Sequence, residues 1–101
     1  MNVITKATLQ KYMQEFPEAS DWLNTWYEIA EKANWTNFND VKLSYPSADQ
    51  EGDDRVVFNV KGNKFRLIVR FSFQFKVLQI KWFGRHKEYD RIDVLTVQPN
   101  S

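Results

Sequence analysis

The chain has 101 residues, with 14 basic and 13 acidic side chains, sixteen aromatic residues, one histidine and no cysteine. This length fits a single domain over residues 1–101, the aromatic content excludes intrinsic disorder, and the lack of cysteine excludes disulfides, thiolate metal sites and a cysteine nucleophile. The longest apolar runs, at residues 56–58 and 67–69, are too short for a membrane span or a signal peptide, so we expect a cytoplasmic protein.

The first half of the chain predicts helices. Residues 1–5 fit a short opening strand, and Thr5 is a candidate N-cap for a helix that Pro17 ends. One face of this helix carries apolar residues at helical spacing, namely Leu9, Tyr12, Met13 and Phe16. A second helix starting at Ser20-Asp21 has a broad apolar face made of Trp22, Leu23, Trp26, Tyr27, Ile29, Ala30 and Ala33. The aliphatic residues between the aromatic ones favour burial of this face against a sheet over a role in base stacking.

A short helix over residues 37–43 and a polar loop over residues 45–54 lead into two strands. Apolar and polar side chains alternate in residues 55–60 and 64–73, which indicates strands with one buried face. A two-residue Gly62-Asn63 loop would fix the register of this hairpin. On the buried face it pairs Val60 with Phe65, Phe58 with Leu67 and Val56 with Val69. On the opposite face it places Asn59 beside Arg66 and Arg55 beside Arg70.

A third strand over residues 76–83 is expected to bury Leu78, Ile80 and Trp82 and to turn Val77, Gln79, Lys81 and Phe83 to the other face. With a two-residue Gln74-Phe75 turn before it, Arg70 lies near Gln79 and Arg66 near Phe83. The predicted fold class is therefore α+β, with two N-terminal helices packed on one face of a small antiparallel β-sheet.

Charge is divided unevenly along the chain. Residues 1–54 have four basic and ten acidic side chains, whereas residues 55–101 have ten basic and three acidic ones. Residues 55–87 contain nine basic side chains and no carboxylate. This asymmetry favours a polyanionic partner for the basic half, although neutralisation between the halves or simple solvation would explain it as well.

The predicted register collects this basic charge on the outward face of the sheet. The polar residues expected there are Arg55, Asn59, Lys64, Arg66, Arg70, Gln79 and Lys81, with Arg85 and His86 just beyond the last strand. Like charges on neighbouring strands repel each other unless an anion binds between them, and guanidinium groups donate paired hydrogen bonds to phosphate. We therefore expect a nucleic acid or another phosphate ligand on this face.

The candidate catalytic residues are few. The sequence has no glycine-rich phosphate loop, no Ser-His-Asp arrangement and no cluster of metal ligands, so no metal or cofactor is expected. RNA can be cleaved without a metal because its 2′-hydroxyl attacks the adjacent phosphate, given groups that move protons and cations that stabilise the phosphorane. His86 or Tyr89 could move the protons, and Arg66, Arg70, Lys64 or Lys81 could supply the charge. Alternatively, a lone histidine is an ordinary surface or structural residue.

Two motifs carry a resemblance to a known family. Residues 58–67, which include Gly62-Asn63 and Arg66, and residues 84–90, which include His86 and Tyr89, resemble the HigB family of bacterial toxins. Trp26-Tyr27 and residues 45–49 also match segments of that family, so the similarity covers nearly the whole chain. Arg85 departs from the pattern, which usually has threonine there, and we interpret it as an added phosphate contact.

The resemblance implies a RelE-like fold whose basic sheet face holds mRNA. It also implies an endoribonuclease that cuts translated mRNA on the ribosome and is neutralised by a HigA-type helix-turn-helix antitoxin. Carried over by motif, His86 is the proton-transfer group, Tyr89 its orienting partner or a stacking group, and Arg66 the phosphate stabiliser. Two alternatives use the same face: a non-catalytic RNA-binding or regulatory module, and an interface for an acidic protein.

Overall fold

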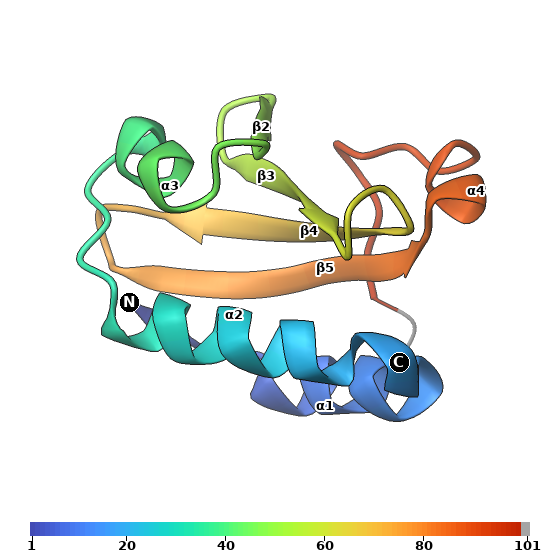
Figure 1. The fold of residues 1–101 in the computed structure, drawn as a ribbon. Helices are drawn as coiled ribbons and strands as arrows, with labels where there is room; N and C mark the ends of the chain where they lie inside the picture. The colour runs from blue at the N-terminus through green and yellow to red at the C-terminus, as the bar shows by residue number, and fades with distance from the viewer. Residues whose placement is uncertain (100–101) are drawn as a thin grey trace.

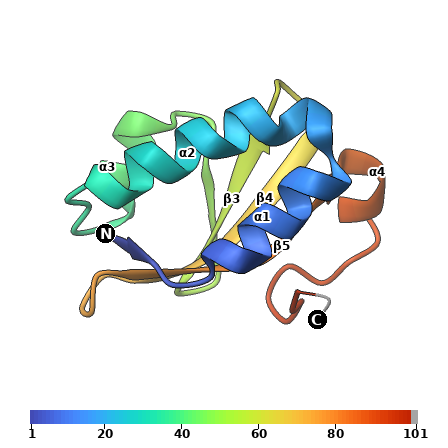
Figure 2. The ribbon, with the colours of Figure 1, turned by 90° about the horizontal axis from the view of Figure 1, so that it is seen from below.

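The computed structural model describes residues 1–99 and has two layers, a helical one and a five-stranded sheet (Figure 1). The helical layer contains α1 (Lys6–Glu15), a 3₁₀ turn η1 (Pro17–Ala19) and α2 (Ser20–Lys32). The strands are β1 (Asn2–Val3), β2 (Asp49–Glu51), β3 (Arg55–Val60), β4 (Phe65–Ser72) and β5 (Val77–Arg85), in the spatial order β1-β5-β4-β3-β2. Two short helices remain, α3 (Phe38–Ser44) before β2 and α4 (His86–Tyr89) after β5. Figure 2 looks onto the helical layer and shows α1 and α2 covering β3, β4 and β5. The predicted α+β fold is confirmed.

The opening strand and the first helix are joined by Thr5. β1 pairs with β5 in parallel, and it is the one parallel pair of a sheet whose other pairs are antiparallel. Thr5 is the N-cap residue of α1, as predicted, but its side chain makes no capping hydrogen bond. Its hydroxyl instead accepts the N–H of Ile80 at 2.7 Å, just past the point where β1 ends. The Thr5 hydroxyl therefore binds a backbone N–H of β5 beyond the end of β1, and not a backbone N–H of the helix.

The two long helices bury the faces that their sequence predicts, with one exception. Leu9, Leu23, Trp26 and Ala30 are fully buried, and the rings of Trp26 and Phe58 meet edge to face at 5.7 Å. Ile29 was expected on the buried face, but 41% of it is exposed. The aromatic face is wider than the area of sheet beneath α2, so its outer margin remains in solvent.

The β3–β4 hairpin has the predicted register. Val60 pairs with Phe65 and Asn59 with Arg66, and the pairing continues to Arg55 and Arg70. The connection is longer than predicted, because residues 61–64 all lie outside the strands. Lys61 and Gly62, rather than Gly62 and Asn63, have positive φ angles of 52° and 69°. A four-residue loop keeps the same pairs opposite each other as a two-residue loop, so the faces are unchanged.

The β4–β5 pair differs from the prediction in its second half. Arg70 lies opposite Gln79 as expected, but a β-bulge follows Ile80, and Ile68 then lies opposite Trp82. The extra residue reverses the alternation, so Phe83 is buried in the core and Trp82 lies on the outward face with Arg66 and Ile68. The predictions for Trp82 and Phe83 were therefore wrong, and both errors have this one cause.

The segment between the helices and the meander contains one predicted and one unpredicted element. The predicted short helix is α3, whose N-cap Asn37 accepts the N–H of Asp40 at 3.0 Å. β2 lies within the stretch expected to be a loop and pairs with β3 at the edge of the sheet. No helix within residues 1–99 has the length and apolarity to cross a membrane.

Candidate functional site

Three side chains named from the sequence meet at one end of the outward sheet face. The guanidinium carbon of Arg66, on β4, lies 5.6 Å from the ring centroid of Tyr89, on α4. The rings of His86 and Tyr89 are 6.3 Å apart and nearly edge to face. Tyr89 therefore lies beside both a cation and an imidazole.

The β3–β4 loop fixes two members of this group. Asn63 Oδ1 accepts a hydrogen bond from Arg66 Nη2 at 2.6 Å, and the carbonyl of Phe65 accepts one from Nη1 at 3.1 Å. The carbonyl of Lys64 accepts the backbone N–H of His86 at 3.0 Å, which holds the start of α4 against the loop. Arg66 is only 9% exposed. Its position is therefore set by the protein before any ligand arrives.

His86 presents one of its two ring nitrogens to solvent. Nδ1 is shielded from solvent and has no hydrogen-bond partner, and it lies 3.5 Å from Asp90 Oδ1. The side chain as a whole is 41% exposed, so Nε2 is the nitrogen that a ligand can reach. This arrangement suits a group that accepts a proton through Nε2.

Tyr89 is held in its neutral form. Burial is the main cause that raises the pKa of its phenol, and the carboxylates of Glu51, Asp49 and Asp90 raise it further. Arg66 acts in the opposite direction, but the net pKa shift is upward. At neutral pH Tyr89 is therefore a hydrogen-bond donor and not a base.

Trp82 is a member of the site that the sequence analysis missed. Its ring lies 6.3 Å from that of Tyr89 on the outward face. Trp82 and Phe83 are neighbouring aromatic residues, so periodicity alone did not distinguish the buried one from the outward one. The sequence feature that could have indicated an outward Trp82 is the glycine two residues later, Gly84, because any other side chain there would collide with the Trp82 ring.

The other end of the outward face is partly covered by the C-terminal segment. Arg55 was expected to be free for RNA, but it is only 5% exposed and donates through Nη1 to the carbonyls of Val94 and Val97 at 3.0 and 2.7 Å. Its role here is to fasten this segment to the sheet. Val57 and Ile68, on the same face, are also buried. The basic face is therefore smaller than the strand pattern predicted.

Arg70, Gln79 and Lys81 lie together beside the covered part. Arg70 pairs with Asp54 at 2.7 Å, and Lys81 donates to the side chain of Gln98 at 3.0 Å. Desolvation is the main cause that lowers the pKa of Lys81, and the charges of Arg55 and Arg70 lower it further. The smaller contribution, from Arg55 and Arg70, is the repulsion between neighbouring cations expected from the sequence, and an added anion would relieve it.

The three remaining RNA-binding candidates divide between the two faces. Asn59 is partly exposed opposite Arg66, and Lys64 is exposed in the β3–β4 loop.

Arg85 was expected on the outward face, but the bulge turns it toward the helices. There it pairs with Glu18 at 3.1 Å, and its guanidinium carbon lies over the rings of Phe65 and Phe16 at 5.1 and 5.7 Å.

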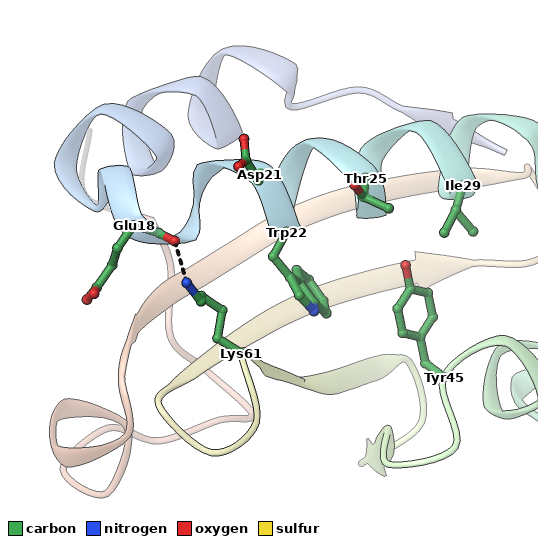
Figure 3. A pocket seen from close by; sticks show the side chains of 7 residues that line it. All are labelled: Glu18, Asp21, Trp22, Thr25, Ile29, Tyr45 and Lys61. Carbon is green, nitrogen blue, oxygen red and sulfur yellow. Dashed lines mark hydrogen bonds between the residues drawn. The ribbon is translucent and has the colours of Figure 1, made fainter.

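A large hollow lies on the helical side of the molecule and contains none of the candidate residues (Figure 3). It measures about 510 Å³ and is lined by Glu18, Asp21, Trp22, Thr25, Ile29, Tyr45 and Lys61. Burial raises the pKa of Tyr45 in its wall to about 12. Within residues 1–99 no group of three or more His, Cys, Asp or Glu side chains is placed to hold a metal ion. Lys61 is the one cation in this lining, and its ammonium already donates to the carbonyl of Glu18 at 3.0 Å. The lining contains no imidazole, so we place the site on the other side of the sheet.

Comparisons with known proteins agree on one family. A family model described as HigB_toxin, the RelE-like toxic component of a toxin-antitoxin system, matches residues 19–92. The mRNA interferase toxin HigB of Escherichia coli (strain K12) is 28% identical over 92 residues, which cover 89% of this chain and 88% of that protein. The proteins named mRNA interferase HigB of Escherichia coli O157:H7 and Shigella flexneri match with the same identity and coverage. The matched range contains every candidate residue from Arg55 to Tyr89.

Proposed function

The chain belongs to the HigB family of RelE-like toxins, and from that premise we propose that it is an endoribonuclease that cuts translated mRNA on the ribosome without a metal ion. The observation that carries the catalytic part is the meeting of Arg66, His86 and Tyr89 at one end of the basic face. Residues 1–101 would then act as one toxin domain in the cytoplasm, where translated mRNA is found.

The reaction follows from the nucleophile that RNA itself carries. His86 Nε2 takes the proton of the 2′-hydroxyl, and the 2′-oxygen forms a bond to the adjacent phosphorus. The bond from phosphorus to the 5′-oxygen breaks, water gives a proton to that oxygen, and the hydroxide that remains takes the proton from the His86 imidazolium. The products are a 2′,3′-cyclic phosphate and a 5′-hydroxyl, so atoms and charges balance without a metal ion.

The other two residues act on charge and position. Arg66 supplies fixed positive charge beside the phosphate, where the pentacoordinate intermediate gains negative charge. The neutral phenol of Tyr89 donates a hydrogen bond and keeps the imidazole in place through ring contact. Asp90, 3.5 Å from Nδ1, stabilises the imidazolium once the proton has been transferred.

RNA would be held by the part of the basic face that remains open. The accessible residues along this surface are Lys64, Arg70, Gln79 and Lys81, and Asn59 of β3 is partly exposed beside Arg66. Arg55 and Arg85 are engaged in contacts within the protein, so we expect them to act on the fold more than on RNA. A toxin of a toxin–antitoxin family has an antitoxin partner, and we expect a HigA-type helix-turn-helix protein in that role.

A non-catalytic RNA-binding module is the second candidate, and the burial of Arg66 favours it. Two of the guanidinium hydrogen bonds of Arg66 are already made within the protein, which leaves fewer for a phosphate. Such a protein would block translation by occupying mRNA without cutting it.

Cleavage mapping separates the two functions. Purified protein is incubated with either free mRNA or ribosomes programmed with the same mRNA, cut positions are mapped by primer extension, and the chemistry of the new RNA ends is determined. We expect cuts in translated codons on ribosomes, with 2′,3′-cyclic phosphate and 5′-hydroxyl ends. Binding without cuts in both samples would favour the non-catalytic module, and 3′-hydroxyl and 5′-phosphate ends, the products of metal-activated water, would overturn the metal-free reaction.

Expression in a bacterium tests the toxin function and the partner together. We expect inducible expression of this chain to arrest growth, and co-expression of the open reading frame beside its gene to relieve the arrest. Growth arrest that no neighbouring frame relieves would contradict the proposed antitoxin partnership.

A further inference from the structure

A small cleft lies beside the candidate catalytic group, between α1 and the end of β5. It measures about 260 Å³, and its lining includes Trp82 and Gly84 of β5, Glu88 of α4, and Lys11 and Glu15 of α1. Pockets for drug-sized ligands span about 300–1,000 Å³. This cleft is therefore suited to a smaller, flat ligand.

The position of Trp82 in the cleft depends on two features of β5. The bulge after Ile80 turns the side chain outward, and bulges often redirect side chains beside active sites. Gly84 makes room for the ring, because a Cβ at this position would lie 2.6 and 2.7 Å from two Trp82 ring carbons. Both features place the Trp82 ring at the surface beside Tyr89, where it adds little to the stability of the core.

The charges around the cleft select the part of RNA that can enter. Glu15 and Glu88 would repel a phosphate, but carboxylates accept hydrogen bonds from the exocyclic amino groups of bases. Lys11 can donate to ring nitrogens or carbonyl oxygens. A base can also stack on Trp82, since every base has a flat π face.

We propose that this cleft binds one unstacked nucleobase of the RNA, stacked on Trp82 and selected for an exocyclic amino group by Glu15 and Glu88. The proposal rests on the proposed function, because the Trp82 ring adjoins Tyr89 and the bound base would be next to the scissile phosphate. Trp82 would then be a specificity-determining residue of the cleavage reaction, and adenine, cytosine and guanine, which each carry an exocyclic amino group, would be preferred over uracil.

The test uses short single-stranded RNA that the protein cannot cut. Pentanucleotides with 2′-O-methyl groups carry 2-aminopurine, whose fluorescence falls on stacking, or each of the natural bases at the central position. We expect wild-type protein to quench 2-aminopurine, and Trp82→Leu to weaken binding by about 5- to 150-fold and to remove the quenching. Trp82→Phe should keep part of both effects. Trp22→Leu is the matched control, because Trp22 lines the hollow on the helical side, and it should bind as the wild type does.

Base preference is measured on the same oligonucleotides. Glu88→Gln should reduce the preference for adenine, cytosine and guanine over uracil without removing the quenching. Gly84→Ala should displace the Trp82 ring and reproduce the binding defect, and Trp82→Leu remains informative if the Gly84 variant does not fold. Absence of quenching by the wild type, or a folded Trp82→Leu protein with unchanged affinity and base preference, would overturn the inference.

The same proteins distinguish a failure of the inference from a failure of the proposed function. If the wild type cuts programmed ribosomes and Trp82→Leu cuts the same codons at the same rates, the base site is wrong and the endoribonuclease stands. If the wild type quenches 2-aminopurine but cuts nothing, the base site stands and the proposed reaction is wrong.

Discussion

His86 is the residue on which the proposed chemistry depends. It is the only histidine of the chain, and its Nδ1 is buried against Asp90 while the rest of the ring is accessible. We expect His86→Ala to lower the cleavage rate about 10²- to 10⁴-fold, because a general acid–base group contributes about that much. The rate per folded molecule should be measured on programmed ribosomes, with thermal stability and RNA affinity from the same preparation.

A structural role for His86 would give the opposite pattern. The variant would then melt at a lower temperature but would cut RNA at the wild-type rate per folded molecule. Full activity in a folded His86→Ala protein would move the proton-transfer role to Tyr89. Because the pKa of Tyr89 is raised, it would have to act as an acid and not as a base.

The site could be predicted from the sequence only in part at this scale. The motif around Gly62-Asn63 and the motif around His86 are more than twenty residues apart. The strand register placed Arg66 and His86 on one face, and the resemblance indicated their separate roles. The roles of Asn63 and Lys64 in holding Arg66 and His86 depend on a side-chain oxygen and a backbone carbonyl. A backbone carbonyl is present at every residue, so it leaves no mark in the sequence.

At the scale of elements, β4 contributes side chains both to the buried core and to the outward face of the sheet. Leu67 is fully buried in the core, whereas its neighbour Arg66 contacts Tyr89 on the other side. Leu67→Ala should lower the free energy of unfolding by about 2–5 kcal/mol, because it removes buried methyl groups and leaves a cavity. Urea unfolding followed by circular dichroism measures this change. Phe75→Ala is the control, since Phe75 is 72% exposed and its loss should cost less than about 0.5 kcal/mol.

A denaturation midpoint near that of the wild type for Leu67→Ala would show that β4 does not hold the core as described. A large loss of unfolding free energy in Phe75→Ala would mean that the Phe75 side chain in the β4–β5 turn is buried in solution. Either result would contradict the assignment of faces.

Tyr45, which follows α3, predicts how stability depends on alkaline pH. Burial raises the pKa of its phenol to about 12, above the ordinary value of about 10. A raised folded-state pKa gives stability that is complete below pH 10 and is lost as the pH rises toward 12. Because Tyr45 is only half-buried, we expect the loss to be about 1–2 kcal/mol, below the value that two full pKa units would give.

The Tyr45→Phe variant isolates this effect. Phenylalanine keeps the ring contacts to Phe58 and Trp22 at 5.2 and 5.8 Å but has no proton to lose. Urea unfolding at pH 8 should give similar stabilities for both proteins, and unfolding near pH 12 should show the wild type weakened by the stated amount more than the variant. An equal loss in both proteins would show that Tyr45 ionises as freely when folded as when unfolded.

The strands show which features of the fold were predictable. The register of β3 and β4 followed from alternation, because a shift by one residue would have exposed Phe58 and Leu67. The bulge in β5 was not predictable, because apolar and aromatic residues occupy both alternating sets from Val77 to Phe83. β2 was missed because its three residues, Asp49 to Glu51, are polar and carry no strand signal.

At the scale of the whole molecule, the uneven charge along the sequence gives the helical layer and the central strands of the sheet opposite net charges. The acidic first half forms the helical layer and the two edge strands β1 and β2, and the basic second half forms the three central strands β3, β4 and β5. The C-terminal segment then covers part of the basic face through Arg55. The distribution of charged residues along the sequence predicted an acidic and a basic part of the molecule. It did not predict that the C-terminal segment covers part of the basic face, because Arg55 holds that segment through backbone carbonyls, which every residue has.

The open part of the basic face predicts how RNA binding depends on salt. Lys64, Arg70 and Lys81 are the cations proposed to contact phosphates, and each contact with a single strand releases about 0.7 counterions. Replacing all three by alanine should therefore lower the slope of log K against log salt by about 2. The loss of affinity should be similar for RNAs of different sequence, because phosphates are common to all of them.

A control on the helical layer makes this result specific to the face. Lys6→Ala/Lys32→Ala removes two cations from α1 and α2, on the other side of the sheet, and should leave the slope unchanged. Affinities for a 2′-O-methyl RNA between 50 and about 300 mM salt, measured by fluorescence anisotropy, give both slopes. If the triple variant keeps the wild-type slope, RNA does not bind along β4 and β5. If the control variant loses slope as well, the attraction comes from the net charge of the protein and not from the arrangement of its strands.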